Sequence, residues 1–184
     1  GGAQGSIRSS DYGYVASTAT GLDIYRFPFA SPAPFTNVGD TLDASPPTSA
    51  MASAMGATDG TYGFLMGGQY SAGNVNVDSV TKITLGGSPI ATADTGAELT
   101  AERLSALGLS DIANSYMYSA GGNDPAPGYV NTIEKGAFSI SSGAFTDHGD
   151  LAAAKQANMG SASTTHGYSA GGYTSGPINV IEKW

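Results

Sequence analysis

His166-Gly167-Tyr168-Ser169-Ala170-Gly171-Gly172 joins alternating aromatic residues to a closing glycine pair, and related stretches precede it in the chain. They begin at Tyr12, Tyr62 and Tyr116, so consecutive copies start 50, 54 and 50 residues apart. Self-similarity at such a period indicates a repeat architecture, in which each unit is one small supersecondary structure. The chain is therefore expected to be an array of related units.

Two further segments recur in the same order after each copy. The second occupies 22–26, 78–82, 131–135 and 179–183, and the third occupies 35–40, 92–97 and 145–150. Short segments rich in β-branched and aromatic residues, bounded by Gly, Pro and Asn, are typical of strands. The stretch 99–107 could form helical turns, but its counterpart contains Pro46-Pro47, so a helix is not required there. We predict an all-β chain.

The unit, an aromatic strand ending in Gly-Gly and followed by short strands, resembles the kelch repeat, which folds as one four-stranded blade of a β-propeller. The segments 166–172, 179–184 and 145–151 together are similar to the kelch-like repeats of marine bacteriophage virion and tail proteins. The resemblance implies a kelch-like β-propeller of about 3.5 blades of antiparallel strands, in units of about 1–45, 46–99, 100–151 and 152–184. Ser17-Thr18 and Met117 depart from the pattern, so their blades should differ locally.

Aligned on the repeat, Trp184 corresponds to Gly136, so the last unit is incomplete. A propeller is stabilised by closing its ring, which leaves no blade with a bare face. Three alternatives remain open: a portion of a larger propeller, which we favour, a small propeller with an incomplete blade, or a homo-oligomer whose copies close the ring together.

Composition excludes several function classes. The 15 acidic residues outnumber the 7 basic ones, and the net charge of -8 opposes binding to nucleic acid or to an anionic membrane surface. No stretch reaches the roughly 20 apolar residues of a membrane span, so no membrane insertion is expected. The absence of Cys excludes disulfides, thiolate metal sites and the Tyr–Cys cofactor of galactose-oxidase-like kelch enzymes.

The residues that could carry chemistry are mostly tied to the repeat. Six of the seven basic residues recur at repeat positions, which indicates a scaffold role, with Asp40, Glu98 and Asp150 as the expected partners. Asp147 and Asp150 have Asn37 and Asp40 as counterparts, which favours a turn role.

The two histidines do not suggest a metal centre. His166 stands at an aromatic position and His148 aligns with Val38 and Thr95, so we expect no metal, no cofactor and no catalytic residue. Neither a Gly-x-Ser-x-Gly elbow in a suitable context nor a phosphate-binding loop occurs.

The connections between the first two segments differ most in length and content, and insertions of this kind map to one face of a repeat protein, often its binding face. They could equally be solvated turns. The predicted ligand-binding residues combine tyrosines with amides and a carboxylate, a mixture that suits sugar or protein recognition: Tyr70, Asn74, Asn76, Asn123, Asp124, Tyr129 and Tyr173.

We therefore expect a non-catalytic structural or receptor-binding module of a phage tail, fibre or capsid surface, located in the virion or outside the cell. Its expected partners are other virion proteins or a host-surface glycan. The alternatives are a carbohydrate-active enzyme built on a propeller and an intracellular kelch-type adaptor, because a fold alone does not determine function.

Overall fold

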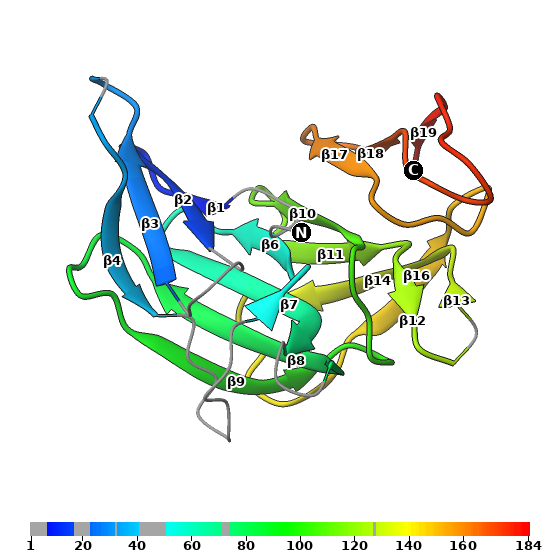
Figure 1. The fold of residues 1–184 in the computed structure, drawn as a ribbon, viewed down its shortest axis with the longest axis horizontal. Coiled ribbons are helices and arrows are strands. Elements are labelled where there is room, and N and C mark those ends of the chain that lie inside the picture. Colours follow the sequence, from blue (N-terminus) through cyan, green and yellow to red (C-terminus); the bar gives the residue numbers. More distant parts are fainter. Residues whose placement is uncertain (1–6, 17–22, 32, 41–50, 71–73, 127) are drawn as a thin grey trace.

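The computed structural model describes residues 7–16, 23–31, 33–40, 51–70, 74–126 and 128–184. Every regular element in these ranges is a strand, which confirms the predicted all-β class. The strands form four small antiparallel sheets that follow one another along the chain as the blades of a β-propeller (Figure 1). The predicted propeller is therefore confirmed, and the stretch 99–107 contains no helix.

Each blade is built in chain order from its inner strand outward. Blade 1 consists of β1 (Ile7–Arg8), β2 (Tyr12–Ala16), β3 (Asp23–Pro28) and β4 (Thr36–Asp40). Blade 2 consists of β6 (Met55–Thr58), β7 (Tyr62–Tyr70), β8 (Val75–Thr84) and β9 (Thr92–Glu98), with β5 (Met51–Ala52) paired to β7. Blade 3 consists of β10 (Leu107–Asp111), β11 (Tyr116–Ala120), β14 (Thr132–Ala137) and β16 (Thr146–Asp150). Blade 4 consists of β17 (Met159–Ala162), β18 (Gly167–Ala170) and β19 (Ile181–Lys183).

Two smaller pairings lie outside this plan. A hairpin of β12 (Asn123–Asp124) and β13 (Gly128–Tyr129) extends from blade 3, and β15 (Gly143–Ala144) pairs in parallel with β9 of blade 2. The predicted segments account for the second, third and fourth strands of the blades. The inner strands β1, β6, β10 and β17 lie outside those segments.

The inner ends of the blades are joined by main-chain hydrogen bonds that repeat from blade to blade. The amide of Ser105 donates to the carbonyl of Ser53 at 3.0 Å, and the amide of Ala157 donates to the carbonyl of Ser105 at 2.8 Å. Their φ angles are nearly identical, 57° at Ser53, 55° at Ser105 and 53° at Ala157. Blades 2, 3 and 4 therefore begin with the same backbone geometry, whether the residue there is serine or alanine.

The glycine pairs provide a second joint between neighbouring blades. Gly68 and Gly122 donate their amides at 2.7 Å to the carbonyls of Arg103 and Lys155, each of which lies at the entry to the next blade. A Cβ on the adjacent Gly67 would lie 2.5 Å from the Arg103 carbonyl oxygen. The close approach of two backbones, together with φ of 55° at Gly67, explains why glycine stands there. Ser17 and Thr18, where the first copy departs from this pattern, lie outside the described residues.

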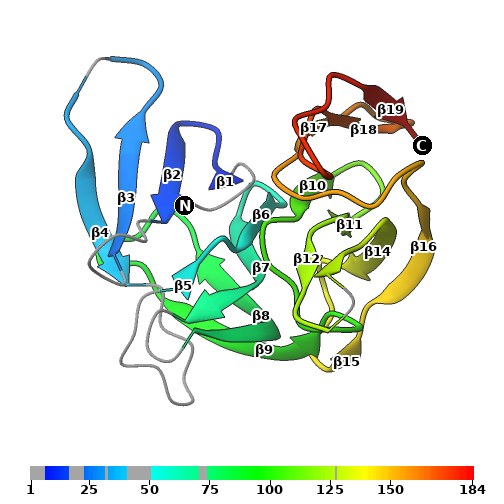
Figure 2. The same ribbon diagram turned by 45° about the vertical axis from the view of Figure 1, so that its right-hand side comes forward.

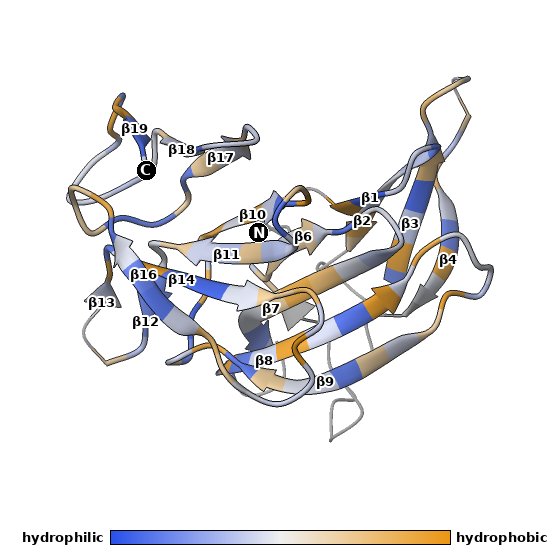
Figure 3. Ribbon diagram, turned by 180° about the vertical axis from the view of Figure 1, so that it is seen from behind, coloured by the Kyte–Doolittle hydropathy of each residue, from blue (hydrophilic) through white to orange (hydrophobic). Residues whose placement is uncertain are grey.

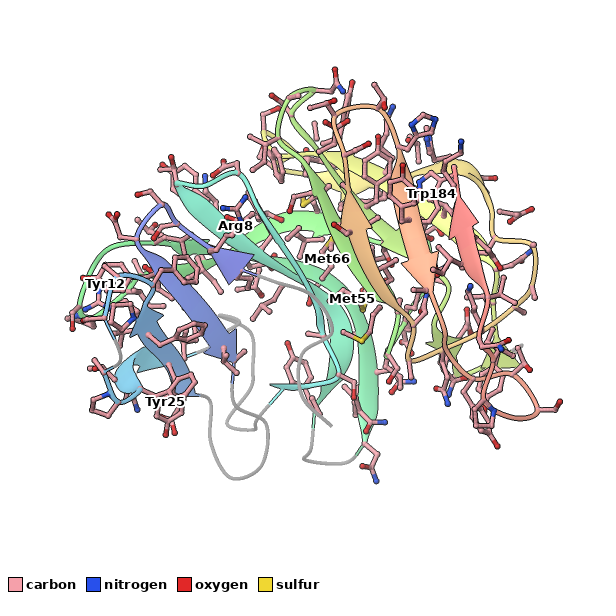
Figure 4. The ribbon with its side chains drawn as sticks, turned by 90° about the horizontal axis from the view of Figure 1, so that it is seen from above. Arg8, Tyr12, Tyr25, Met55, Met66 and Trp184 are labelled. Carbon is pink, nitrogen blue, oxygen red and sulfur yellow. The ribbon has the colours of Figure 1, made fainter. Side chains whose placement is uncertain are left out.

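Apolar side chains fill the space between consecutive blades. We call residues at the same position of the repeat cognate, the face of a blade toward the next blade its forward face, and the opposite face its backward face. Phe64, on the forward face of blade 2, stacks on Phe138 of blade 3 with ring centroids 5.4 Å apart. Figure 3 shows hydrophobic residues along β7 and β8, and Figure 4 places Met55 and Met66 between blades 2 and 3. Separate clusters fill the interfaces of blades 1 and 2 and of blades 3 and 4.

At Met117, where blade 3 departs from the repeat pattern, the large and the small residue of a cross-strand pair have changed places. In blades 1 and 4 a glycine of the second strand lies under an aromatic ring of the third, Gly13 under Phe27 and Gly167 under Trp184. In blade 3 the large residue, Met117, is on β11 and is paired with Gly136 on β14, where Phe145 covers the glycine. The predicted local difference in blade 3 is confirmed.

The basic residues serve the scaffold, but their partners are not the predicted ones. Arg103 Nη2 lies 3.1 Å from Glu134 Oε1, and Lys155 Nζ lies 3.1 Å from Glu182 Oε1, so Glu98 and Asp150 were wrong as partners. Glu134 and Glu182 are cognate residues on the third strand of their blades, where each faces the basic residue at the entry of the same blade. The third predicted partner, Asp40, ends β4.

Three of the other four recurrent basic residues lie over tyrosine rings, and the fourth, Lys183, has His166 at the tyrosine position. Arg26, Lys82 and Lys135 lie 4.4, 3.6 and 4.1 Å from the ring centroids of Tyr12, Tyr62 and Tyr116. Such cation–π contacts each contribute roughly 0.5–1 kcal/mol at exposed sites. This second group is thus held within its own blades.

The predicted turn role is confirmed for Asn37 and Asp147, and Asp94 shares it, whereas Asp150 ends β16. The side chains of Asn37, Asp94 and Asp147 accept hydrogen bonds from the amides two residues later, at 3.1, 2.8 and 2.9 Å. Each donor is a glycine with positive φ, and the strand register shifts there. These side chains therefore stabilise a recurrent β-bulge.

Candidate functional site

In every blade the second strand ends and the third begins at the same edge of the propeller, because strand directions alternate within each blade. We call this the loop edge. The opposite edge, the turn edge, carries the short turns between the first and second strands. All the predicted ligand-binding residues lie toward the loop edge, on or beside β7–β8, β12–β13 and the β18–β19 connection.

Two predicted tyrosines from different blades meet there. The rings of Tyr129, on β13, and Tyr173, in the β18–β19 connection, are perpendicular, with centroids 6.3 Å apart. Gln156 donates its side-chain amide to the Tyr129 hydroxyl at 3.3 Å, and its backbone forms a reciprocal pair with Tyr173 at 3.0 and 2.9 Å. Both rings are exposed. These three residues form what we call the tyrosine platform.

The β12–β13 hairpin, which extends from blade 3 (Figure 1), carries Tyr129 on β13. The backbone of Asn123 pairs with that of Leu104, at 2.8 and 3.0 Å, and also with the Tyr129 strand. The Asp124 side chain accepts a hydrogen bond from the Ala126 amide at 2.8 Å, which stabilises the turn. Asn123 and Asp124 therefore act on the platform through the backbone that carries Tyr129.

The remaining predicted residues belong to blade 2 and form a separate group. The Gln69 side chain donates to the amide oxygen of Asn76 at 2.9 Å, across the paired strands β7 and β8. Asn74 is exposed, with φ of 52°, at the turn into β8. Tyr70 packs against the cluster between blades 1 and 2, whereas Tyr129 and Tyr173 lie on blades 3 and 4. The predicted set thus divides into the tyrosine platform with its hairpin and a blade 2 group.

A cleft at the turn edge contains residues that sequence reasoning treated separately. It encloses about 420 Å³, including its open mouth, and both histidines line it. The rings of His148 and Tyr118 are 5.2 Å apart, and the Thr165 hydroxyl lies 2.8 Å from Nδ1 of His166. Burial, followed by the charge of Asp111 and the neighbouring Tyr116, raises the pKa of Tyr118 above its usual value.

This cleft occupies the position that aromatic packing fills one interface earlier. Tyr118 is cognate with Phe64, and Phe64 is covered by the ring of Phe138. Asp111 also caps its own turn, since both its carboxylate oxygens accept hydrogen bonds from Asn114, at 3.2 and 2.8 Å. Within the described ranges, no group of three His, Asp or Glu side chains is placed to hold a metal ion. Aligning Tyr118 with Phe64 was the sequence signal that could have located this cleft.

A second hollow lies between the inner strands at the turn edge. The hydroxyls of Thr58, Ser110 and Ser161 line it, and Arg8 is its charged residue. The Thr58 hydroxyl donates to the carbonyl of Arg8 at 2.8 Å, and the Thr58 amide donates to the Ser110 hydroxyl oxygen at 2.8 Å. Thr58, Ser110 and the backbone of Arg8 are therefore bonded to one another in the wall of this hollow.

The tyrosine platform lacks the basic side chains that an anion-binding site needs. Arg103 and Lys155 are buried in ion pairs, and Arg26, Lys82 and Lys135 lie over tyrosine rings. The platform is built from phenol and amide groups, with Asp124 as a nearby carboxylate. In the part of the chain that the structure describes, no helix has the length and apolar character to span a membrane.

Comparison with known proteins adds no further assignment. The chain matches no protein-family model, and it has no match among curated proteins.

Proposed function

We propose that this propeller is a non-catalytic glycan-binding module of a phage particle and that the tyrosine platform is its binding surface. The observation that carries the proposal is the exposed perpendicular pair of Tyr129 and Tyr173, fixed by Gln156. Aromatic faces contact the apolar side of a sugar ring, while phenol and amide groups exchange hydrogen bonds with its hydroxyls. A pair from two blades presents both kinds of contact on one rigid support.

Charge favours a neutral glycan over a sulfated or sialylated one. The chain carries a net charge of -8, and the platform has no basic side chain among its members. Binding an anionic sugar would require an uncompensated charge to approach this surface. Neutral hexose oligosaccharides are therefore the class of ligand that fits best.

The assignment as a binding module rather than a hydrolase rests on the acidic residues. Glycoside hydrolysis ordinarily uses two carboxyl groups about 5–10 Å apart, flanking the scissile bond. Beside the platform, the described carboxylate is Asp124, which is already bonded to the Ala126 amide. The origin in a kelch-like repeat protein of a phage virion is supported by the resemblance of 166–172 and 179–184 to such repeats.

A glycan array with the 184-residue chain, followed by calorimetric titration of the best neutral oligosaccharide, tests this proposal. Tyr129→Ala and Tyr173→Ala should each weaken binding roughly tenfold, because each removes one aromatic contact. Tyr25→Ala on blade 1 is the matched control and should leave the affinity unchanged. Equal affinity in all three variants would refute the platform, and release of reducing ends would show an enzyme instead.

A further inference from the structure

The two outermost blade faces expose apolar residues that have buried cognates in other blades. Ile181, on the forward face of blade 4, is 73% exposed, whereas its cognates Ile133, Val80 and Ile24 are at most 1% exposed. Met159, on β17 at the other side of β18, is 74% exposed, and its cognates Leu107 and Met55 are buried. The forward face of blade 4 thus has the composition of an interface without a neighbouring blade.

The backward face of blade 1 shows the complementary pattern. Phe35 is 59% exposed, whereas its cognate Phe145 is 3% exposed in the interface of blades 2 and 3. Phe29 is also exposed, although its cognate Phe138 receives the ring of Phe64. Phe29 and Phe35 both pack against Phe27, with centroid distances of 5.8 and 5.1 Å. Exposed aromatic clusters of this kind mark interaction surfaces.

Main-chain groups on blade 4 repeat the observation independently. Gly68 and Gly122 donate to a carbonyl of the next blade, but the amide of their cognate Gly172 has no such acceptor within the described part of the chain. The carbonyl of Ala157 likewise lacks, among the described residues, the donor that Ser53 and Ser105 find in the following blade. Blade 4 therefore ends with both main-chain joints open.

We propose that blade 4 packs on blade 1 of a second copy of this chain, head to tail. The occupant follows from continuity with the existing interfaces, each of which joins one forward face to one backward face. Tyr168, the cognate of Phe64, would then meet Phe29 of the other copy as Phe64 meets Phe138. Blades 1 and 4 lie at opposite ends of the row (Figure 2), so one chain's end faces do not cover each other.

Two copies related by a twofold axis would close into a ring of eight blades, which contains two equal heterologous interfaces. Propellers typically contain about 4–8 blades, so a ring of this size lies within the range of the architecture. The proposal concerns the end faces and is independent of the glycan surface at the loop edge.

Light scattering coupled to size exclusion tests the dimer, using the 184-residue chain of 18.4 kDa. We expect twice the chain mass, and the chain mass alone for both Phe35→Asp and Ile181→Asp. Ile112→Asp is the matched control, because Ile112 is an exposed apolar residue in the β10–β11 turn, away from both end faces. Circular dichroism checks that each variant remains folded.

Mixing the variants tests the head-to-tail arrangement. Phe35→Asp and Ile181→Asp chains together retain one unaltered interface and should form a heterodimer of lower affinity. A dimer through two like faces would instead leave one of these variants dimeric by itself, which would overturn the proposal. A monomeric parent chain would overturn it as well, and assemblies that grow with concentration would overturn the closed ring.

Discussion

Blades 3 and 4 share one strand plan but differ in their surroundings. Tyr118 pairs with Lys135 in blade 3, as Tyr168 pairs with Lys183 in blade 4. Blade 3 is packed on both faces, whereas blade 4 is packed on its backward face and exposes Met159 and Ile181 on the other. The difference shows that the burial of a repeated apolar position depends on whether a neighbouring blade packs on it.

The largest expected effect separates cognate isoleucines of the two blades. Ile133→Asp places a carboxylate in the sealed interface and should cost more than about 4 kcal/mol of unfolding free energy, enough to prevent folding. Ile181→Asp places the carboxylate on the open end face of the single chain, so it should separate the proposed dimer but leave each chain folded. Urea unfolding followed by circular dichroism measures both. Equal losses would show that blade 4 is packed on both faces like blade 3.

The two ion pairs provide the next comparison. Glu134 is fully buried, binds Arg103 and accepts the Thr100 hydroxyl, so Glu134→Gln should cost about 3–5 kcal/mol by leaving the guanidinium unpaired. Glu182 is partly exposed, and its other oxygen accepts the Ala152 amide at 3.1 Å. Glu182→Gln should therefore cost less, by at least about 1 kcal/mol. Chemical denaturation of both variants measures the difference, and the reverse order would contradict it.

The glycines of the two cross-strand pairs, Gly136 in blade 3 and Gly167 in blade 4, predict a smaller difference in stability. A Cβ on Gly136 would lie 2.4 Å from the ring of Phe145, which is buried and cannot move aside, so Gly136→Ala should cost about 1–3 kcal/mol. A Cβ on Gly167 would also lie 2.4 Å from a ring, that of Trp184, but this ring is partly exposed and can shift. Gly167→Ala should thus cost less. Thermal melts of the two variants decide between them.

His166→Tyr should stabilise blade 4 slightly. His166 stands where Tyr116 lies under Lys135, and Lys183 is the cognate of that lysine. A tyrosine would supply the missing ring, with an expected gain of about 0.5–1 kcal/mol. The same substitution in a Lys183→Met background is the control and should give no gain. An equal gain in both backgrounds would show that the cation is not involved.

The stability contributed by Tyr118, at the turn edge, should depend on pH. Its pKa is raised by burial first and then by Asp111, so the folded protein binds its phenolic proton more tightly than the unfolded chain does. The contribution of Tyr118 to stability is therefore present below the unfolded pKa of about 10 and is lost as pH rises through the folded pKa. Ultraviolet difference titration of the parent chain against Tyr118→Phe measures it. Asp111→Asn should move the pKa part of the way down, and no movement would exclude the carboxylate.

The strands from the second to the fourth were predictable because each combines a repeat position with an aromatic or β-branched pattern. The inner strands were not predictable. The strand β1 has only two residues, and Met55–Thr58 and Met159–Ala162 consist mostly of small residues, which give no recognisable strand pattern. The pairing of Arg103 with Glu134 was missed because the face of β14 on which Glu134 lies depends on the strand register, which the sequence does not state. Tyr129 and Tyr173 were predicted individually, but their contact depends on how blade 4 is rotated against blade 3.

The main-chain joint of Ser53, Ser105 and Ala157 has a consequence for the history of the molecule. Because the joint uses backbone atoms, it needs no particular side-chain chemistry at that position, only a residue that accepts the recurrent left-handed φ. A duplicated unit inherits a working connector at both ends, and later substitutions can diversify its loops without disturbing the connection. Copy number and surface chemistry can thus evolve separately in an array of this kind.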